Sequence, residues 1–307
     1  MRKNSFKGII ILLITAAIWG FAFAAQSTAM ESIHPFTFQA IRSALGALVL
    51  IPFIFIGDGI KKKKGTYVKP SKSEIKMLLT GGIFCGIALT AACCFQQFGI
   101  CYTTASKSGF ITSMYMLMVP VLGIFLKHKI PGRTWIYVGI AVVGMYFLCI
   151  GDGFSVNKGD LLTLVCAFFF SIQITLVDYF APKTDGIKLS CIEFAVTAAI
   201  SGILMLIFER PSANAIISSW LPIVYAGVFS CGMGYTFQII GQKYTEPAVA
   251  SLIMSLESVF ATIGGILLLH EMPAAKEWVG IGLMFSAVML SQISGKKQVN
   301  KEDFIKK

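Results

Sequence analysis

Three ionisable residues, Arg42, Glu193 and Glu257, lie inside long apolar stretches of the sequence. A charged side chain at the centre of a bilayer costs about 2.5–3.5 kcal/mol on insertion scales, so such residues are candidates for function. Glu257 lies near the middle of its stretch, and removal from water favours the neutral form of a carboxyl group. We therefore expect Glu257 either to contact a substrate or exchange protons, or to form a structural hydrogen bond between helices.

Arg42 and Glu193 occupy equivalent places in their stretches, about seven residues from one end, which is roughly 10 Å at 1.5 Å per residue. Positions this near a surface let a long side chain reach lipid headgroups, so a structural role competes with substrate binding or coupling. Their distances are measured from opposite surfaces of the membrane, so the two residues differ in depth by about 10 Å. We therefore expect no direct ion pair between them.

Several aromatic and amide side chains are further candidates. Trp19 lies in the middle of a stretch rather than at the interface, where Trp usually collects. With Phe23 one turn later, it would either line a cavity and stack on an apolar substrate or pack against a neighbouring helix. Tyr115 and Gln173 are candidates for substrate contact. Pro120 removes a helix hydrogen bond and predicts a kink.

The composition indicates an all-α polytopic membrane protein. Hydrophobic residues make up 56% of the 307 residues and charged residues 13%, against roughly 45–50% and ~25% in soluble domains. A bilayer can act as the solvent for so much apolar surface. The net charge of +11 comes from short basic clusters between apolar stretches, which is typical of topology signals and contact with anionic lipids rather than of nucleic-acid binding.

The sequence offers little for covalent chemistry. It has no G-x-x-x-x-G-K-[ST] motif, so we expect no ATP hydrolysis. The eight cysteines form no C-x-x-C pair and the three histidines lack metal-ligand spacing, so we expect neither metal nor cofactor. A membrane-embedded enzyme would need catalytic groups clustered at one depth, and these groups are scattered. We therefore expect the protein not to be an enzyme.

A helix needs about 20 apolar residues to cross a hydrocarbon core of roughly 30 Å. This length predicts ten transmembrane helices, near residues 8–30, 35–57, 75–97, 105–126, 133–150, 159–181, 187–208, 219–240, 247–269 and 276–293. Lys and Arg mark the cytoplasmic side of membrane proteins. With a cytoplasmic N-terminus, 21 basic residues fall in cytoplasmic segments and four in outside segments. We therefore expect a protein of the cell membrane with both termini, including a basic tail at 294–307, in the cytoplasm.

The chain contains an internal repeat. Residues 95–131 align with residues 237–273 at a constant offset of 142 without a gap, and 12 of the 37 positions are identical. Polar identities such as Gln96 and Gln238 do not follow from apolar composition alone. These two residues are therefore candidates for substrate binding or gating, with a helix-capping hydrogen bond as the alternative. By the same offset, Tyr115 corresponds to Glu257.

The repeat divides the chain into two units, 8–150 and 159–293, each with five predicted helices. An odd number of helices makes the second unit enter the membrane from the opposite side. We therefore predict ten transmembrane helices arranged as two inverted five-helix repeats. Many secondary transporters use inverted repeats to expose one central site to either side of the membrane in turn.

Three segments carry a family resemblance: AAIWGFAFA at 16–24, VPVLGIFLKHKIPGRTW at 119–135 and SLESVFATIGGILLLHEMP at 255–273. In order and spacing they resemble the EamA-type transporters of the drug/metabolite transporter superfamily, over about residues 8–293. The last two segments are similar to that family's repeated apolar helix ending in Leu-x-Glu, although the first half has Lys129 where the second has Glu271. The resemblance implies a ten-helix carrier with a central cavity that moves metabolites, amino acids or drugs, often outward.

We therefore expect a secondary active transporter that exports small molecules through a cavity lined by the first, third, fourth, sixth, eighth and ninth helices. The expected partners are a small-molecule substrate, membrane lipids and, through Glu257, protons. A passive channel or a membrane interaction protein without transport is the alternative, and accumulation of a substrate against its gradient would separate these functions. The sequence leaves open the substrate, the direction, the coupling ion and the choice between monomer and homodimer.

Overall fold

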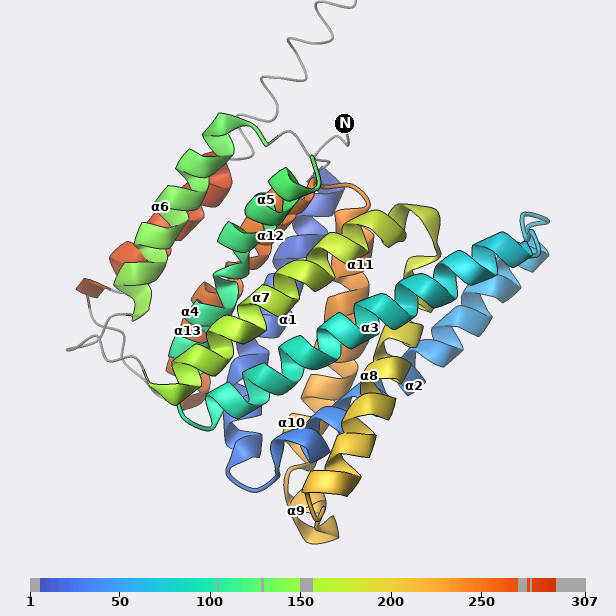
Figure 1. The fold of residues 1–307 in the computed structure, drawn as a ribbon, viewed down its shortest axis with the longest axis horizontal. Coiled ribbons are helices and arrows are strands. Elements are labelled where there is room, and N and C mark those ends of the chain that lie inside the picture. Colours follow the sequence, from blue (N-terminus) through green and yellow to red (C-terminus); the bar gives the residue numbers. More distant parts are fainter. Residues whose placement is uncertain are drawn as a thin grey trace, which may run out of the picture.

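The computed structural model describes residues 6–103, 105–127, 130–149, 157–269, 275–276 and 278–290, and every regular element within these ranges is helical. The expected basic tail at 294–307 lies outside them, as do Glu271 and its counterpart Lys129. Figure 1 shows a bundle of long helices, some of which run side by side while others cross.

The first half of the chain forms α1 (Phe6–Met30), α2 (Pro35–Lys63), α3 (Lys72–Ile100), α4 (Ala105–Ser113), α5 (Tyr115–Phe125) and α6 (Gly132–Cys149). The second half forms α7 (Lys158–Phe180), η1 (Ala181–Lys183), α8 (Gly186–Phe208), α9 (Ala213–Ser218), α10 (Trp220–Val224), the π-helix η2 (Tyr225–Tyr235), α11 (Thr236–Gln242), α12 (Pro247–Met254) and α13 (Glu257–Leu269). A further apolar helix spans Trp278–Leu290.

Capping residues explain where several helices begin. At the start of α3, the side chains of Ser71 and Glu74 each accept a hydrogen bond from the other residue's backbone N–H, and Asn157 and Asp160 repeat this capping box at α7. The Asp185 carboxylate accepts backbone N–H groups at the start of α8. These caps satisfy N–H groups that the first turn of a helix leaves without partners.

Within the described residues, eight helical segments are long and apolar enough to cross a membrane. They correspond to the first four expected spans and to the sixth through ninth. The fifth and tenth expected spans coincide with α6, of 18 residues, and with the shorter apolar helix Trp278–Leu290. The chain is therefore a multi-pass membrane protein.

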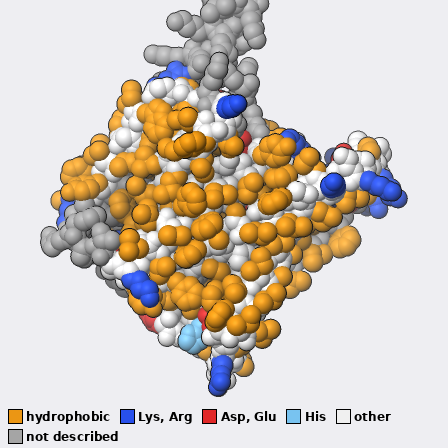
Figure 2. Space-filling model, in the orientation of Figure 1, with side chains coloured by type: hydrophobic (Ala, Val, Ile, Leu, Met, Phe, Trp, Pro, Cys, Tyr) orange, Lys and Arg blue, Asp and Glu red, His pale blue; other side chains and the backbone are white. Residues whose placement is uncertain are grey.

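The outer surface of the bundle is apolar. Phe55 of α2 is 72% exposed, Leu206 of α8 74% and Leu267 of α13 61%. Figure 2 shows hydrophobic side chains over most of this face, with Lys and Arg at its margins. Water would not favour so large an apolar patch, whereas lipid tails would cover it.

Helices of the two halves interleave. α3 packs against α7 and α8, and α2 also runs along α8. In the same way, η2 and α11 pack against α1, and η2 also packs against α2. Figure 1 shows α3 and α7 side by side across the front of the bundle. Each half therefore depends on the other for burial of its helices.

Two helices are interrupted at corresponding positions. α4 and α5 are separated at Met114, and α12 and α13 at Ser255 and Leu256; the repeat offset of 142 places Met114 on Leu256. Pro120, where the sequence predicts a kink, lies inside α5, six residues after the interruption at Met114. Both interruptions lie in the interior of the bundle and place polar backbone there.

Candidate functional site: a cavity between the two halves

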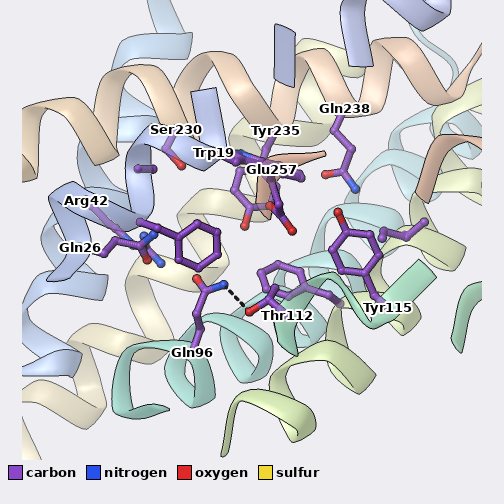
Figure 3. A pocket seen from close by; sticks show the side chains of 14 residues that line it. Trp19, Gln26, Arg42, Gln96, Thr112, Tyr115, Ser230, Tyr235, Gln238 and Glu257 are labelled. Atoms are coloured by element: carbon purple, nitrogen blue, oxygen red, sulfur yellow. Dashed lines mark hydrogen bonds between the residues drawn. The ribbon is translucent and has the colours of Figure 1, made fainter. Parts of the chain in front are cut away.

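A cavity lies between the two halves of the chain (Figure 3). It is lined by α1, α2, α3, α4 and α5 of the first half and by α7, η2, α11 and α13 of the second. Its empty volume is about 400 Å³ when adjoining open space is included, and the centre of a water molecule can reach about 20 Å³ of it. This conformation has room for a water molecule or two, so a larger ligand requires the helices to move apart.

Seven of the nine residues singled out from the sequence line this cavity: Trp19, Phe23, Arg42, Gln96, Tyr115, Gln238 and Glu257. The remaining two, Gln173 and Glu193, lie behind Gln238 and connect to it by hydrogen bonds. The helices expected to line the cavity all contribute, and α2 adds Arg42.

The Arg42 side chain points into the bundle, which contradicts the alternative that it reaches lipid headgroups. It is 3% exposed. Its Nε donates to Oε1 of Gln39 at 2.7 Å, and its Nη1 donates to Oε1 of Gln26 at 2.9 Å. The guanidinium carbon also lies 5.2 Å from the ring centre of Phe38. Depth counted along a helix does not determine the direction of a side chain, and here that direction is inward.

Aromatic and aliphatic side chains form the apolar walls. Trp19 and Phe23 of α1 line the cavity one turn apart, and Phe170 and Ile174 of α7 repeat this spacing from the other half. The ring of Tyr235 lies 4.5 Å from that of Trp19, at an interplanar angle of 51°. Such faces favour an aromatic or apolar group in the cavity.

The two helix interruptions meet at the cavity. Tyr115 is the first residue of α5, and its counterpart Glu257 is the first residue of α13. The Ser113 hydroxyl is 2.9 Å from the carbonyl oxygen of Gly109 in its own helix, 3.2 Å from Oε1 of Glu257 and 3.4 Å from the carbonyl oxygen of Ser255, so it can donate to any one of the three. The Tyr115 hydroxyl lies near the Glu257 carboxyl but does not reach the full geometry of a hydrogen bond. Polar groups from both halves are thus concentrated at one place.

Amide side chains connect the cavity to a second buried carboxyl. Gln238 on the cavity wall donates through Nε2 to Oε1 of Gln173 at 3.0 Å, and Gln173 donates through Nε2 to Oε1 of Glu193 at 2.7 Å. Glu193 is 0% exposed, so it does not reach headgroups, and its Oε2 has no hydrogen-bond partner among the described residues. Gln96, the counterpart of Gln238, donates to the Thr112 hydroxyl at 3.3 Å.

Sequence reasoning missed several lining residues, among them Gln26, Thr112, Phe170, Ser230 and Tyr235. A glutamine inside a predicted span was a usable signal for Gln26, because an amide in a bilayer needs a partner. Tyr235 corresponds to Cys93 at the repeat offset, and the two side chains lie 3.7 Å apart. Because these two residues differ in type, a search for identities could not find the pair.

The sequence model of the EamA-like transporter family matches this chain twice, at residues 6–150 and 157–292. The chain belongs to this family. Its relatives include an uncharacterized transporter of Archaeoglobus fulgidus, 29% identical over 286 residues that cover 91% of this chain and 83% of the relative. Another uncharacterized transporter, of Clostridium kluyveri, is 25% identical and covers 95% of this chain and 94% of its own.

A solved crystal structure of a protein shares the fold of this EamA-family chain. It has a TM-score of 0.75 and covers 95% of this chain and 98% of its own, at 16% sequence identity. The family model confirms the resemblance to EamA-type transporters at the level of the family. The cavity of this family member offers a guanidinium, a carboxyl group, amides and aromatic faces, which suit reversible binding of a small molecule.

Proposed function

We propose that this EamA-family protein is a secondary active transporter that exports small metabolites, amino acids or drugs by alternating access. It comprises ten membrane helices in two inverted five-helix repeats, 8–150 and 159–293, followed by the basic tail. Both termini lie in the cytoplasm and the protein resides in the cell membrane. The cavity is the substrate site, with Trp19, Phe23, Arg42, Gln96, Tyr115, Gln238 and Glu257 in contact with the substrate.

Several observations support the repeat. The family model matches the chain twice, once in each proposed unit. α3 packs against α7, and the counterparts of these helices, η2 with α11 and α1, also pack together. The helices are interrupted at Met114 and at Leu256, one repeat offset apart. An inverted pair of units that meet at one site can exchange shapes and open that site to either side.

The observation that carries the proposal is the contact of the two interruptions at the cavity. Ser113 of the first half reaches both Ser255 and Glu257 of the second. Movement of one half against the other must therefore change the surroundings of the Glu257 carboxyl. This links the conformation of the bundle to a group that can bind a proton, as proton-coupled transport requires.

A labelling experiment tests alternating access. Ser230 lines the cavity from η2, and Ser230→Cys would be treated in sealed vesicles with a membrane-impermeant thiol reagent from each side. We expect modification from both sides, at rates that a bound substrate changes in opposite directions. The unaltered chain, with its own cysteines, is the control. Labelling from one side only, whatever the ligand, would contradict alternating access.

Transport itself is tested in proteoliposomes with imposed substrate and proton gradients. A thermal-shift screen of amino acids, nucleosides, organic acids and cationic drugs supplies the substrate. Accumulation against the substrate gradient separates a carrier from a channel, and the side of accumulation gives the direction. We expect Glu257→Gln to abolish the pH dependence of transport. An unchanged rate and an unchanged pH profile would remove protons from the proposal.

A further inference from the structure

The charge of Arg42 in the cavity wall is not balanced by a carboxylate of this chain. Among the described residues, no Asp or Glu oxygen lies within 4.0 Å of its guanidinium nitrogens. The titratable side chains around it are those of Cys93, Cys94, Cys231 and Tyr235, which are neutral at physiological pH. Arginine stays protonated in proteins, so a full positive charge resides at this place.

Glutamines orient this charge without neutralising it. Gln39 and Gln26 accept hydrogen bonds from Nε and Nη1 of Arg42. Gln97 donates through Nε2 to the same Oε1 of Gln26 at 2.8 Å, and Gln39 donates through Nε2 to the Ser43 hydroxyl at 3.0 Å. The amide network therefore fixes the guanidinium plane, and Figure 3 shows Arg42 beside Gln26 at one side of the cavity.

Part of the guanidinium is left for a ligand. Arginine has five N–H donors, and only two have hydrogen-bond acceptors among the described residues. Neither N–H group of Nη2 has one. A planar guanidinium with parallel N–H groups matches the two oxygens of a carboxylate or a phosphate. An uncompensated charge in a bilayer is costly, and a ligand anion would remove that cost on binding.

We propose that Arg42 forms an anion subsite in the cavity, and that the transported molecule carries a carboxylate or phosphate group beside an aromatic or apolar body. The anionic group pairs with Arg42, while the rings of Trp19, Phe170 and Tyr235 receive the body. This inference rests on the proposed function, because it names the chemistry of the molecule that the cavity carries.

Four small probes with one ring and different head groups test the subsite on the purified full chain: phenylacetate, benzylphosphonate, phenylacetamide and phenethylamine. Binding is measured by thermal shift over a concentration series in nanodiscs of neutral lipid. We expect the acids to bind at least about tenfold more tightly than the amide and the amine, because only they offer a charge-assisted pair. The ratio of carboxylate to phosphonate affinity identifies the preferred anion.

Substitutions connect this preference to the residue. We expect Arg42→Gln to reduce the acid-to-amide affinity ratio to about one, and Arg42→Lys to keep part of it, because lysine retains the charge without the fork. Arg210→Gln, at an exposed arginine after α8, is the matched control and should leave the ratio unchanged. If Arg42→Gln does not fold, the acid-to-amide affinity ratios of the unaltered chain and of Arg42→Lys test the anion subsite instead.

Three outcomes would overturn the anion subsite: tighter binding of the amine or the amide, no shift with any probe, or an unchanged ratio in a folded Arg42→Gln variant. These results are separable from failure of the transport proposal. Accumulation of a cation or a neutral molecule against its gradient would preserve the carrier and remove the subsite. Selective acid binding without accumulation of any bound acid would preserve the subsite and remove the carrier.

Discussion

The two ends of the bundle are built alike but held differently. At the α1 end, the start of α1 packs on the end of α11; at the α7 end, the start of α7 packs on the end of α3. Gly8 and Gly159 form the close contacts, and each is preceded by a lysine over a tyrosine ring. Lys7 lies 5.5 Å from the ring centre of Tyr244, and Lys158 lies 5.2 Å from that of Tyr102.

One difference between the ends, among the described residues, is the carboxylate of Asp160. At the α7 end, Asp160 accepts hydrogen bonds from Lys107 at 2.6 Å and from the Thr103 hydroxyl at 3.0 Å. When Gly8 is set against Gly159, Ile9 occupies the position of Asp160. The counterpart of Thr103 is Thr245, whose hydroxyl is buried without a hydrogen-bond partner among the described residues.

For the α7 end to open, the ion pair of Lys107 and Asp160 must break, and Ile9 cannot form such a pair at the α1 end. The Asp160 side chain is only 6% exposed, so water screens its ion pair with Lys107 weakly. The polar contacts between α2 and α8 do not distinguish the α1 end from the α7 end, because they occur at both sides of the bundle. Lys61 and Lys188 pair with acids at one side, and Glu209 accepts backbone N–H groups of α2 at the other.

The largest effect is expected from added bulk at the close contacts. A Cβ at Gly159 would lie 2.6 Å from the carbonyl oxygen of Gly99, which belongs to the backbone and cannot turn away. We expect Gly159→Val to hold the α7 end open, reduce transport at least about tenfold, and raise labelling of Ser230→Cys from that side, since overpacking costs about 1–3 kcal/mol.

Gly8→Val is the matched variant at the α1 end. The nearest backbone oxygen, of Gly241, is 3.3 Å from the added Cβ, and the nearer Thr245 hydroxyl can rotate. We expect a smaller loss of transport, with labelling raised from the opposite side. Equal losses, or labelling raised from the same side in both variants, would contradict the comparison.

Removal of the distinguishing charge should have the next largest effect. Asp160→Asn weakens the hydrogen bonds from Lys107 and Thr103, and bonds to a charged group contribute about 1.5–3 kcal/mol. We expect labelling of Ser230→Cys from the α7 side to rise roughly tenfold. Asp58→Asn, which removes an ion pair with Lys188 between α2 and α8, is the control and should not favour either side.

Two Thr→Val substitutions make the same chemical change at the α7 end and at the α1 end. Thr103→Val removes a hydrogen bond to Asp160 and should destabilise the protein by about 1 kcal/mol. Thr245→Val removes a buried hydroxyl without a partner, so we expect no loss of stability or a small gain. Thermal unfolding in detergent measures both. A comparable loss in the two variants would mean that the α1 end has a polar contact equivalent to that of the α7 end.

The smallest expected effect is the pH dependence of the stability that the ion pair of Lys61 and Asp185 gives to the contact of α2 with α8. Burial raises the pKa of Asp185, but hydrogen bonds from Lys61 and from backbone N–H groups of α8 outweigh it and hold that pKa below its ordinary value. A lowered pKa stabilises the folded state above the unfolded-state pKa, near 3.9, and this contribution is lost as pH falls through the folded-state pKa. We therefore expect the stability difference between the unaltered chain and Asp185→Asn to be constant from about pH 5 to pH 8. It should be below about 1 kcal/mol, begin to fall near the unfolded-state pKa of about 3.9, and be lost as pH falls through the lower folded-state pKa. A difference that changes between pH 6 and pH 8 would contradict this assignment.

Much of the candidate site could be predicted because bilayers penalise polar groups. Glu257, Gln238 and Gln96 were identifiable as polar residues in apolar stretches, and the structure places them on one cavity. Arg42 was identified by the same rule, but its distance along the helix suggested headgroup contact. The acceptors on Gln26 and Gln39 draw it inward, and they become neighbours only when α1 and α2 pack.

The sequence by itself determined the membrane class, the family and the length of most helices, because hydropathy and span length act locally along the chain. It also revealed the repeat, because identical residues at a fixed offset can be found in the sequence alone. Only the tertiary structure decided that helices are interrupted at Met114 and Leu256, that these interruptions meet, and that one end carries an ion pair. These features arise from contacts between segments more than fifty residues apart, and no local pattern encodes the direction in which a side chain points within a packed bundle.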